Sequence, residues 1–89
     1  MNYQWDPHKA QSNFEKHGVR FSDAISVFMD DFAITIEDDF SDEERFVTIG
    51  SDAFGRVLIV VYSFRKDATR LISARPASSH ERRQYEGDI

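Results

Sequence analysis

The sequence contains no cysteine, so neither a disulfide framework nor a thiolate metal site can help to hold the fold. Only two prolines and four glycines occur in 89 residues, and no linker, repeat or low-complexity stretch is present. No apolar run approaches the roughly 20 residues that a membrane-spanning helix needs. The N-terminal segment lacks the basic-then-apolar order of a signal peptide. We therefore predict one domain over residues 1–89, cytoplasmic and without a membrane contact.

Several catalytic signatures are also missing. The sequence has no glycine-rich phosphate loop, no nucleophile elbow and no H-E-x-x-H motif. The acidic stretch 37–44 lacks the D-x-D-x-D-G spacing of a calcium loop and is typical of a solvated connection. We therefore expect no metal and no other cofactor.

Hydrophobic residues make up 40 % of the chain and include eight phenylalanines, which is ample for a small core. The charges are unevenly distributed. Residues 1–55 carry four basic and twelve acidic side chains, and residues 56–89 carry seven basic and four acidic ones. The net charge of −5 argues against a general nucleic-acid coat protein. A local anion site in the second part and a basic partner on the first part remain open, as does chance clustering of solvated charges.

Capping signals predict three helices. The first begins at Asp6 and Pro7 and ends before Gly18. The second follows with Ser22 as its expected N-cap. The third covers residues 78–86, where Ser78 and Glu81 have the spacing of a capping box.

Apolar patterning predicts strands at 2–5, 32–38, 45–50, 57–64 and 69–75. The strand 57–64 is apolar nearly throughout, so we place it in the centre of the sheet. The resulting order is β-α-α-β-β-β-β-α, an α+β fold with a small antiparallel sheet.

The hairpin 57–75 is the first candidate for chemistry. We expect Tyr62 opposite Leu71 and Val60 opposite Ser73, which puts Arg75 on the same face as Val60, although a one-residue slip would reverse the faces. Arginines at strand ends can hold a phosphate by two parallel hydrogen bonds. The alternative is that each arginine reaches water or pairs with an acidic side chain.

The last helix is the second candidate. Its only large apolar residue is Tyr85, so it lacks an apolar stripe, and a partner protein, a nucleic acid or contacts of Tyr85 and the arginine stems must hold it. Arg82 and Arg83 lie there, on an exposed face or against RNA. His17, at the end of the first helix, has the titration range of a general acid or base, although a structural role is the alternative.

Four segments together resemble the BrnT toxins of type II toxin–antitoxin systems: "WDPHKAQSNFEKHGVRFSDAISVF" (5–28), "ERFVTIG" (44–50), "VLIVVYSFR" (57–65) and "ISARPASSHERRQYE" (72–86). The resemblance implies a RelE-like fold and a ribonuclease that arrests translation. It also implies a BrnA-like ribbon-helix-helix antitoxin, which contacts operator DNA and can assemble with the toxin as a hetero-tetramer. Where other members often carry basic residues after "SAR", this chain has Pro76 and Ser78, which thins the positive patch.

The polar positions that match the family are Lys16, His17, Arg45, Arg65, Ser73, Arg75, Glu81 and Tyr85. Arg75 and Arg65 are expected to stabilise the reacting phosphate, and His17 or Tyr85 to move protons, or Tyr85 to stack on a base. The expected RNA-binding residues are Lys16, Arg45, Ser73, Arg82 and Arg83. Two alternatives remain: a co-repressor module that binds the antitoxin without cleaving RNA, and a plain domain that forms a homodimer through its last helix.

Overall fold

The structure, a computed structural model, describes residues 2–38 and 44–87. The predicted order of elements is confirmed, with the second helical segment divided into an α-helical and a 3₁₀ part. The elements are β1 (Asn2–Gln4), α1 (Pro7–His17), α2 (Phe21–Ala24), the 3₁₀ helix η1 (Ile25–Met29), β2 (Ile34–Asp38), β3 (Arg45–Ser51), β4 (Val57–Arg65), β5 (Ala68–Pro76) and α3 (Ser79–Glu86). Among the described residues, no helix is long and apolar enough to cross a membrane.

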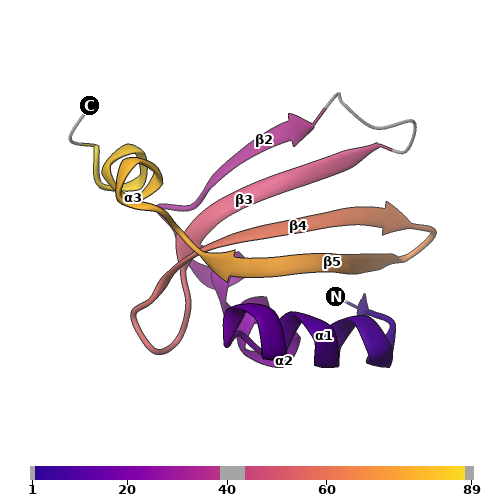
Figure 1. The fold of residues 1–89 in the computed structure, drawn as a ribbon. Helices are drawn as coiled ribbons and strands as arrows, with labels where there is room; N and C mark the ends of the chain where they lie inside the picture. The colour runs from indigo at the N-terminus through magenta and orange to yellow at the C-terminus, as the bar shows by residue number, and fades with distance from the viewer. Residues whose placement is uncertain (1, 39–43, 88–89) are drawn as a thin grey trace.

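The sheet has the strand order β1-β5-β4-β3-β2, so the apolar strand β4 is central, as predicted (Figure 1). Its α+β architecture is confirmed, but the sheet is mixed, because β1 runs parallel to β5. In Figure 1, α1 and α2 lie together on the side of β5, and α3 lies apart from them near β2 and β3. We call the sheet face opposite α1 and α2 the open face; Ile59 and Arg75 belong to it.

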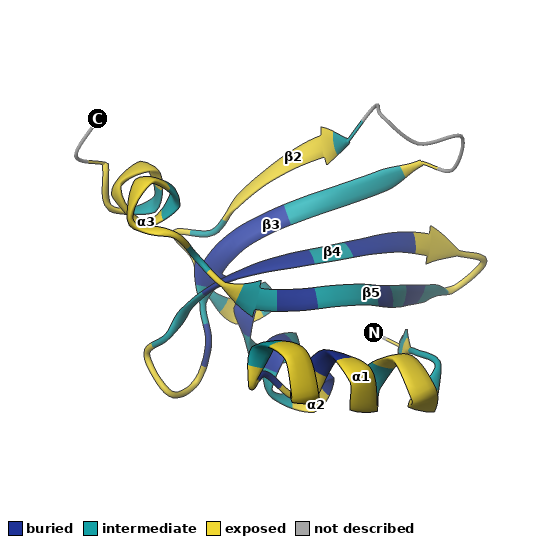
Figure 2. Ribbon diagram, viewed as in Figure 1, coloured by how far each residue is buried: buried dark blue, intermediate teal, exposed yellow. Residues whose placement is uncertain are grey.

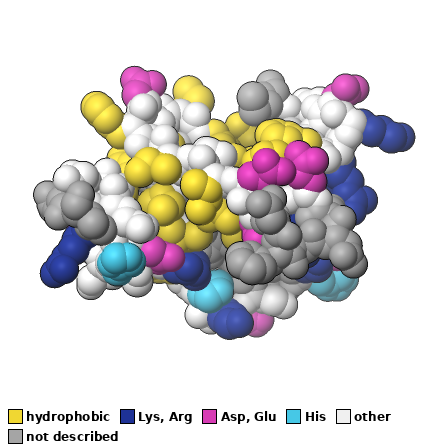
Figure 3. All heavy atoms as spheres, turned by 90° about the horizontal axis from the view of Figure 1, so that it is seen from above, with side chains coloured by type: hydrophobic (Ala, Val, Ile, Leu, Met, Phe, Trp, Pro, Cys, Tyr) yellow, Lys and Arg dark blue, Asp and Glu magenta, His cyan; other side chains and the backbone are white. Residues whose placement is uncertain are grey.

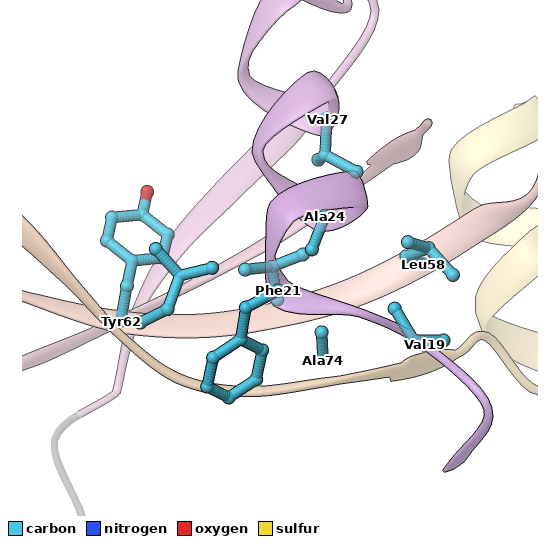
Figure 4. Packing of buried hydrophobic residues seen from close by; sticks show 9 residues of the cluster. Val19, Phe21, Ala24, Val27, Leu58, Tyr62 and Ala74 are labelled. Carbon is cyan, nitrogen blue, oxygen red and sulfur yellow. The ribbon is translucent and has the colours of Figure 1, made fainter. Parts of the chain in front are cut away.

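The core lies between the sheet and the segment that follows α1 (Figure 4). Side chains of this segment pack onto β4 and β5, where Leu58 and Val60 are fully buried. The cluster comprises Val19, Phe21, Ala24, Val27, Leu58, Val60, Tyr62, Leu71 and Ala74. Because α2 and η1 are too short to be stable alone, this packing is what holds them in place.

Helix α1 has the predicted caps: Asp6 accepts from the His8 N–H, and Gly18 adopts a left-handed conformation with φ of 71°. The expected cap of α2 is wrong, since Arg20 occupies the N-cap position and Ser22 lies inside the helix.

Asn13 is the buried residue of α1. Its amide donates to the carbonyls of Ala74 (2.8 Å) and Val19 (3.0 Å), and it accepts from the Ala74 N–H (3.0 Å). β1 pairs with β5 only from Ala68 to Arg70, so the edge of β5 is uncovered further along. The Asn13 side chain therefore replaces a missing strand and fixes α1 against β5.

The register of the β4–β5 hairpin departs from the prediction. Tyr62 pairs with Leu71 as expected, but Val61 pairs with Ser73 and Val60 with Ala74, because a β-bulge inserts one extra residue in β5. A shift of one residue reverses the faces of a strand. The predicted placement of Arg75 beside Val60 is therefore wrong: Arg75 pairs with Ile59 on the open face.

Strand β2 begins at Ile34 rather than at residue 32 and forms the edge of the sheet. It is mostly exposed, in contrast to the neighbouring strand β3, which is partly buried (Figure 2). Most of the predicted acidic connection after it, residues 39–43, lies outside the described residues.

Candidate active site

Arg75, near the end of β5, is held by helix α3. Its Nη1 and Nη2 donate to the two carboxylate oxygens of Glu81, each at 2.8 Å, and Nη1 also reaches the Pro76 carbonyl at 3.3 Å. The same carboxylate accepts from the Ser78 N–H, so the predicted capping box is present. The hydrogen bonds from Arg75 hold the pKa of Glu81 at about 2 and, in return, raise that of Arg75.

This pairing leaves one edge of the Arg75 guanidinium available. A guanidinium has five N–H donors. Glu81 and Pro76 take both hydrogens of Nη1 and one of Nη2. The remaining Nη2–H and the Nε–H form a second fork, which matches the oxygens of a phosphate.

Tyr85 fixes the other end of α3. Its hydroxyl donates to Asp30 Oδ2 at 2.5 Å, and this bond raises the pKa of Tyr85 to about 12. Asp30, which follows η1, also accepts from the Ser51 and Phe32 N–H groups, and these bonds lower its pKa. The phenol therefore remains protonated at neutral pH and serves α3 as an anchor.

Three of the predicted residues meet at a small hollow between α1 and β5. Lys16, His17 and Ser73 line a space of about 210 Å³. Ser73 lies two positions before Arg75 in β5. The fold thus brings a cation, an imidazole and a hydroxyl to one region of β5.

Arg65 and Arg75 are not brought together. Arg65 pairs with Ala68 at the hairpin turn, whereas Arg75 pairs with Ile59, six residues earlier in β4. Six residues of strand span about 20 Å. The expectation that both arginines hold one phosphate is therefore wrong. Arg45, at the start of β3, belongs to the same end of the sheet as Arg65.

Arg82 and Arg83 are exposed on α3, and Arg82 makes only a distant contact with Glu86, at 3.9 Å. The described residues contain no group of three or more His, Cys, Asp or Glu side chains that could hold a metal ion.

Two residues that shape this region were not singled out from the sequence: Asp30 as the partner of Tyr85, and Asn13 as the partner of β5. Both form contacts with residues more than fifty positions away. The doublet of Asp30 and Asp31 indicated only the end of a helix. Nothing in residues 10–17 singled out Asn13 either, because an asparagine in an amphipathic helix usually lies on its polar side.

Comparison with known proteins finds similarity in sequence and in fold. The family model "Ribonuclease toxin, BrnT, of type II toxin-antitoxin system" matches residues 5–81. The crystal structure of the Brucella abortus ribonuclease toxin BrnT is similar, with a TM-score of 0.69 and 27% sequence identity, covering 89% of this chain and 99% of that chain. A search of curated proteins finds no match.

Proposed function

Because the chain belongs to the family of BrnT ribonuclease toxins of type II toxin–antitoxin systems, we propose that it cleaves RNA without a metal ion, in a site centred on Arg75. The family establishes a ribonuclease toxin with a protein antitoxin. The absence of a metal from the reaction, the roles of individual residues and the kind of antitoxin are the proposal. The second fork of the Arg75 guanidinium, held in place by Glu81, is the observation that carries it.

The proposed reaction is attack of a ribose 2′-hydroxyl on the adjacent phosphorus, which expels the 5′-oxygen. It requires a base for the hydroxyl, positive charge near the phosphorane and a proton for the leaving oxygen. Arg75 supplies the charge through its Nε–H and its remaining Nη2–H. Glu81 acts as a positioning residue, because its bidentate contact fixes the plane of the guanidinium.

His17 is the proposed proton carrier. Its imidazole lines the hollow beside Ser73 and can both accept and donate a proton. Tyr85 is less suited to act as a base, since its hydroxyl is bound to Asp30 and its pKa is about 12. Lys16 and Ser73 then contact the RNA backbone beside the reacting phosphate, and Arg82 and Arg83 extend this contact along α3.

We propose a BrnA-like ribbon-helix-helix antitoxin as the partner, forming a hetero-tetramer that contacts operator DNA only through the antitoxin. The edge strand β2 offers unpaired backbone groups for such a partner. Exposed apolar side chains accompany it: Met29 is 82%, Phe32 77% and Ile36 57% exposed. Figure 3, which views the molecule from the side of β2 and α3, shows hydrophobic side chains gathered on this surface.

One observation favours a second candidate, a co-repressor that binds the antitoxin and does not cleave RNA. Arg75 and Tyr85 both have a carboxylate partner within the chain itself. If these contacts were never exchanged for RNA, the site would serve only to hold α3.

The test is cleavage of total RNA by the purified toxin, free of antitoxin, beside Arg75→Lys and Arg20→Lys. Lysine keeps the charge but cannot form the fork, so we expect Arg75→Lys to lose at least about tenfold in rate. Arg20 stacks on Phe14 beside α1 and has no role in the site, so Arg20→Lys should cleave like the native chain. Equal rates for all three proteins would remove Arg75 from the site. Absence of cleavage by the native chain would favour the co-repressor.

A further inference from the structure

A row of polar side chains crosses the sheet at the end opposite Arg75. Ser63 in β4 pairs with Arg70 in β5, and Arg70 pairs with Gln4 in β1. On the other side, Arg45 precedes Phe46, the partner of Tyr62, so Arg45 comes next to Ser63 in the antiparallel ladder. Tyr62 points into the core, and side chains alternate along a strand. Arg45, Ser63 and Arg70 therefore lie side by side on the open face.

The middle of this row contains two orphaned polar atoms. Ser63 is 1% exposed, and its Oγ has no hydrogen-bond partner; the Nε of Arg45 is likewise buried and without a partner. No other buried side-chain nitrogen or oxygen among the described residues lacks one. An orphaned polar group in a folded protein costs free energy and calls for an explanation, such as an ion or ligand that is bound during function.

The two arginines of the row are not neutralised within the described part of the chain. Neither Arg45 nor Arg70 forms an ion pair there, in contrast to Arg56 and Arg75, each of which has a carboxylate. Asp38 lies across from Arg45 on the edge strand and is the one acid in the row. With strands about 4.8 Å apart, the Cα atoms of Arg45 and Arg70 are about 10 Å apart, which allows both guanidinium groups to converge above Ser63.

A hollow adjoins the row at the hairpin turn. It has a volume of about 510 Å³ and is lined by Gln4, Arg65 and Lys66, among other residues. Phe64 also lines it, but its ring contacts the rings of Phe46 and Tyr62, so Phe64 lies on the face opposite the row. Positively charged surfaces of this kind bind the phosphates of single-stranded nucleic acid.

We propose that Arg45, Ser63 and Arg70 bind a backbone phosphate of single-stranded RNA. This contact is separate from the Arg75 site, because Ser63 lies four residues along β4, or about 13 Å, from Ile59, the partner of Arg75. The RNA would run across the open face from the hairpin turn to α3. The Ser63 hydroxyl would donate to this phosphate. The inference rests on the proposed function, because it assigns a further part of the RNA-binding surface.

The test is the affinity for a short fluorescein-labelled 2′-O-methyl RNA, measured by fluorescence anisotropy at several salt concentrations. The methyl group blocks the 2′ attack, so binding is measured without cleavage. The variants are Arg45→Gln, Arg70→Gln and Ser63→Ala, with Arg20→Gln as the matched control for a lost charge. We expect each arginine variant of the row to bind about tenfold more weakly. The slope of log affinity against log salt should also fall by about 0.7 for each lost phosphate contact.

Ser63→Ala keeps every observed contact, so it tests the site even if an arginine variant fails to fold. We expect weaker RNA binding with an unchanged melting temperature. Binding by Arg70→Gln and Ser63→Ala as tight as that of Arg20→Gln would overturn the inference, as would no binding by the native chain.

Cleavage of unmodified RNA, measured in parallel, separates this inference from the proposed function. If the native chain cleaves RNA and the variants of Arg45, Ser63 and Arg70 bind it as tightly as the native chain, only the proposed phosphate contact is refuted. If RNA binding depends on Arg70 but the native chain does not cleave RNA, the proposed cleavage is refuted and the proposed phosphate contact is supported.

Discussion

The hydroxyl of Tyr85 lies 2.5 Å from Asp30 Oδ2, across 55 residues of sequence. Asp30 also accepts from the backbone of Ser51, so a single carboxylate joins α3 to the end of β3. The Arg75–Glu81 pair joins the beginning of α3 to β5. Since α3 contains no buried residue, these two polar contacts take the place of an apolar face. The helix is therefore held by bonds that depend on charge.

The Tyr85–Asp30 contact predicts a local effect of Tyr85→Phe. The variant keeps the ring but loses a hydrogen bond to a charged group, and we expect the free energy of unfolding to fall by about 1 kcal/mol. Amide hydrogen exchange within Ser79–Glu86 should quicken more than that in β4. Gln84→Ala, an exposed change on the same helix, is the control. Unchanged exchange in α3 would show that Tyr85 does not anchor it.

The Arg75–Glu81 pair predicts a dependence of stability on pH. The pKa of Glu81 is lowered from 4.5 to about 2 in the folded chain, so its ionisation stabilises the fold above about pH 4.5, and this contribution is lost as the pH falls towards 2. We expect Glu81→Gln to be less stable than the native chain by about 1 kcal/mol at neutral pH, because solvent screens the partly exposed pair.

This difference between Glu81→Gln and the native chain should narrow in urea titrations between pH 5 and pH 2. Glu86→Gln, whose carboxylate makes only the 3.9 Å contact with Arg82, should show little difference at any pH. A constant difference for Glu81→Gln across the range would contradict the assignment.

The hydrogen bonds of Asn13 predict a larger loss of stability than those of Tyr85 and Glu81. Asn13→Ala leaves the N–H and carbonyl of Ala74 and the carbonyl of Val19 without their partner in a buried region. We expect a loss of about 3 kcal/mol in the free energy of unfolding, measured by denaturant titration. The exposed neighbour Gln11→Ala should change it by less than about 0.5 kcal/mol. Similar values for the two variants would disprove the role of Asn13 in closing the edge of β5.

Removing two buried hydroxyls in neighbouring strands, those of Thr48 and Ser63, should affect the stability differently. Thr48 Oγ1 lies 2.8 Å from both Thr35 Oγ1 and the Tyr62 hydroxyl, so Thr48→Val should cost about 1–2 kcal/mol. The Ser63 hydroxyl has no partner, so Ser63→Ala should leave the stability unchanged or raise it by up to about 1 kcal/mol. A thermal melt of both variants checks this. A clear loss of stability in Ser63→Ala would show that its hydroxyl is bonded within the folded chain.

The features that could be predicted from the sequence are those that local chemistry determines. Asp6 and Gly18 bound α1, Ser78 and Glu81 form a capping box, and the apolar run of β4 lies in the centre of the sheet. Each of these depends on residues within a few positions of one another, or on the composition of one strand.

The features that could not be predicted depend on contacts between distant residues. The bulge at residue 72 falls between the adjacent apolar residues Leu71 and Ile72 and the polar Ser73, a pattern that does not show which register the strand takes, yet it moves Arg75 to the open face. Arg65 lies at the turn of the β4–β5 hairpin and Arg75 lies near its outer end, so the two arginines are at opposite ends of the sheet. The partners of Asn13 and Tyr85 emerge only when the sheet is assembled.

The most direct test of the account is the chemistry of the RNA ends that the antitoxin-free protein produces in the presence of a chelator. Attack by the 2′-hydroxyl without a metal predicts continued cleavage, with 2′,3′-cyclic phosphate and 5′-hydroxyl ends, and a rate that falls in Arg75→Lys but not in Arg20→Lys. Cleavage that stops when the chelator is added, or that leaves 5′-phosphate ends, would contradict a metal-independent reaction centred on Arg75.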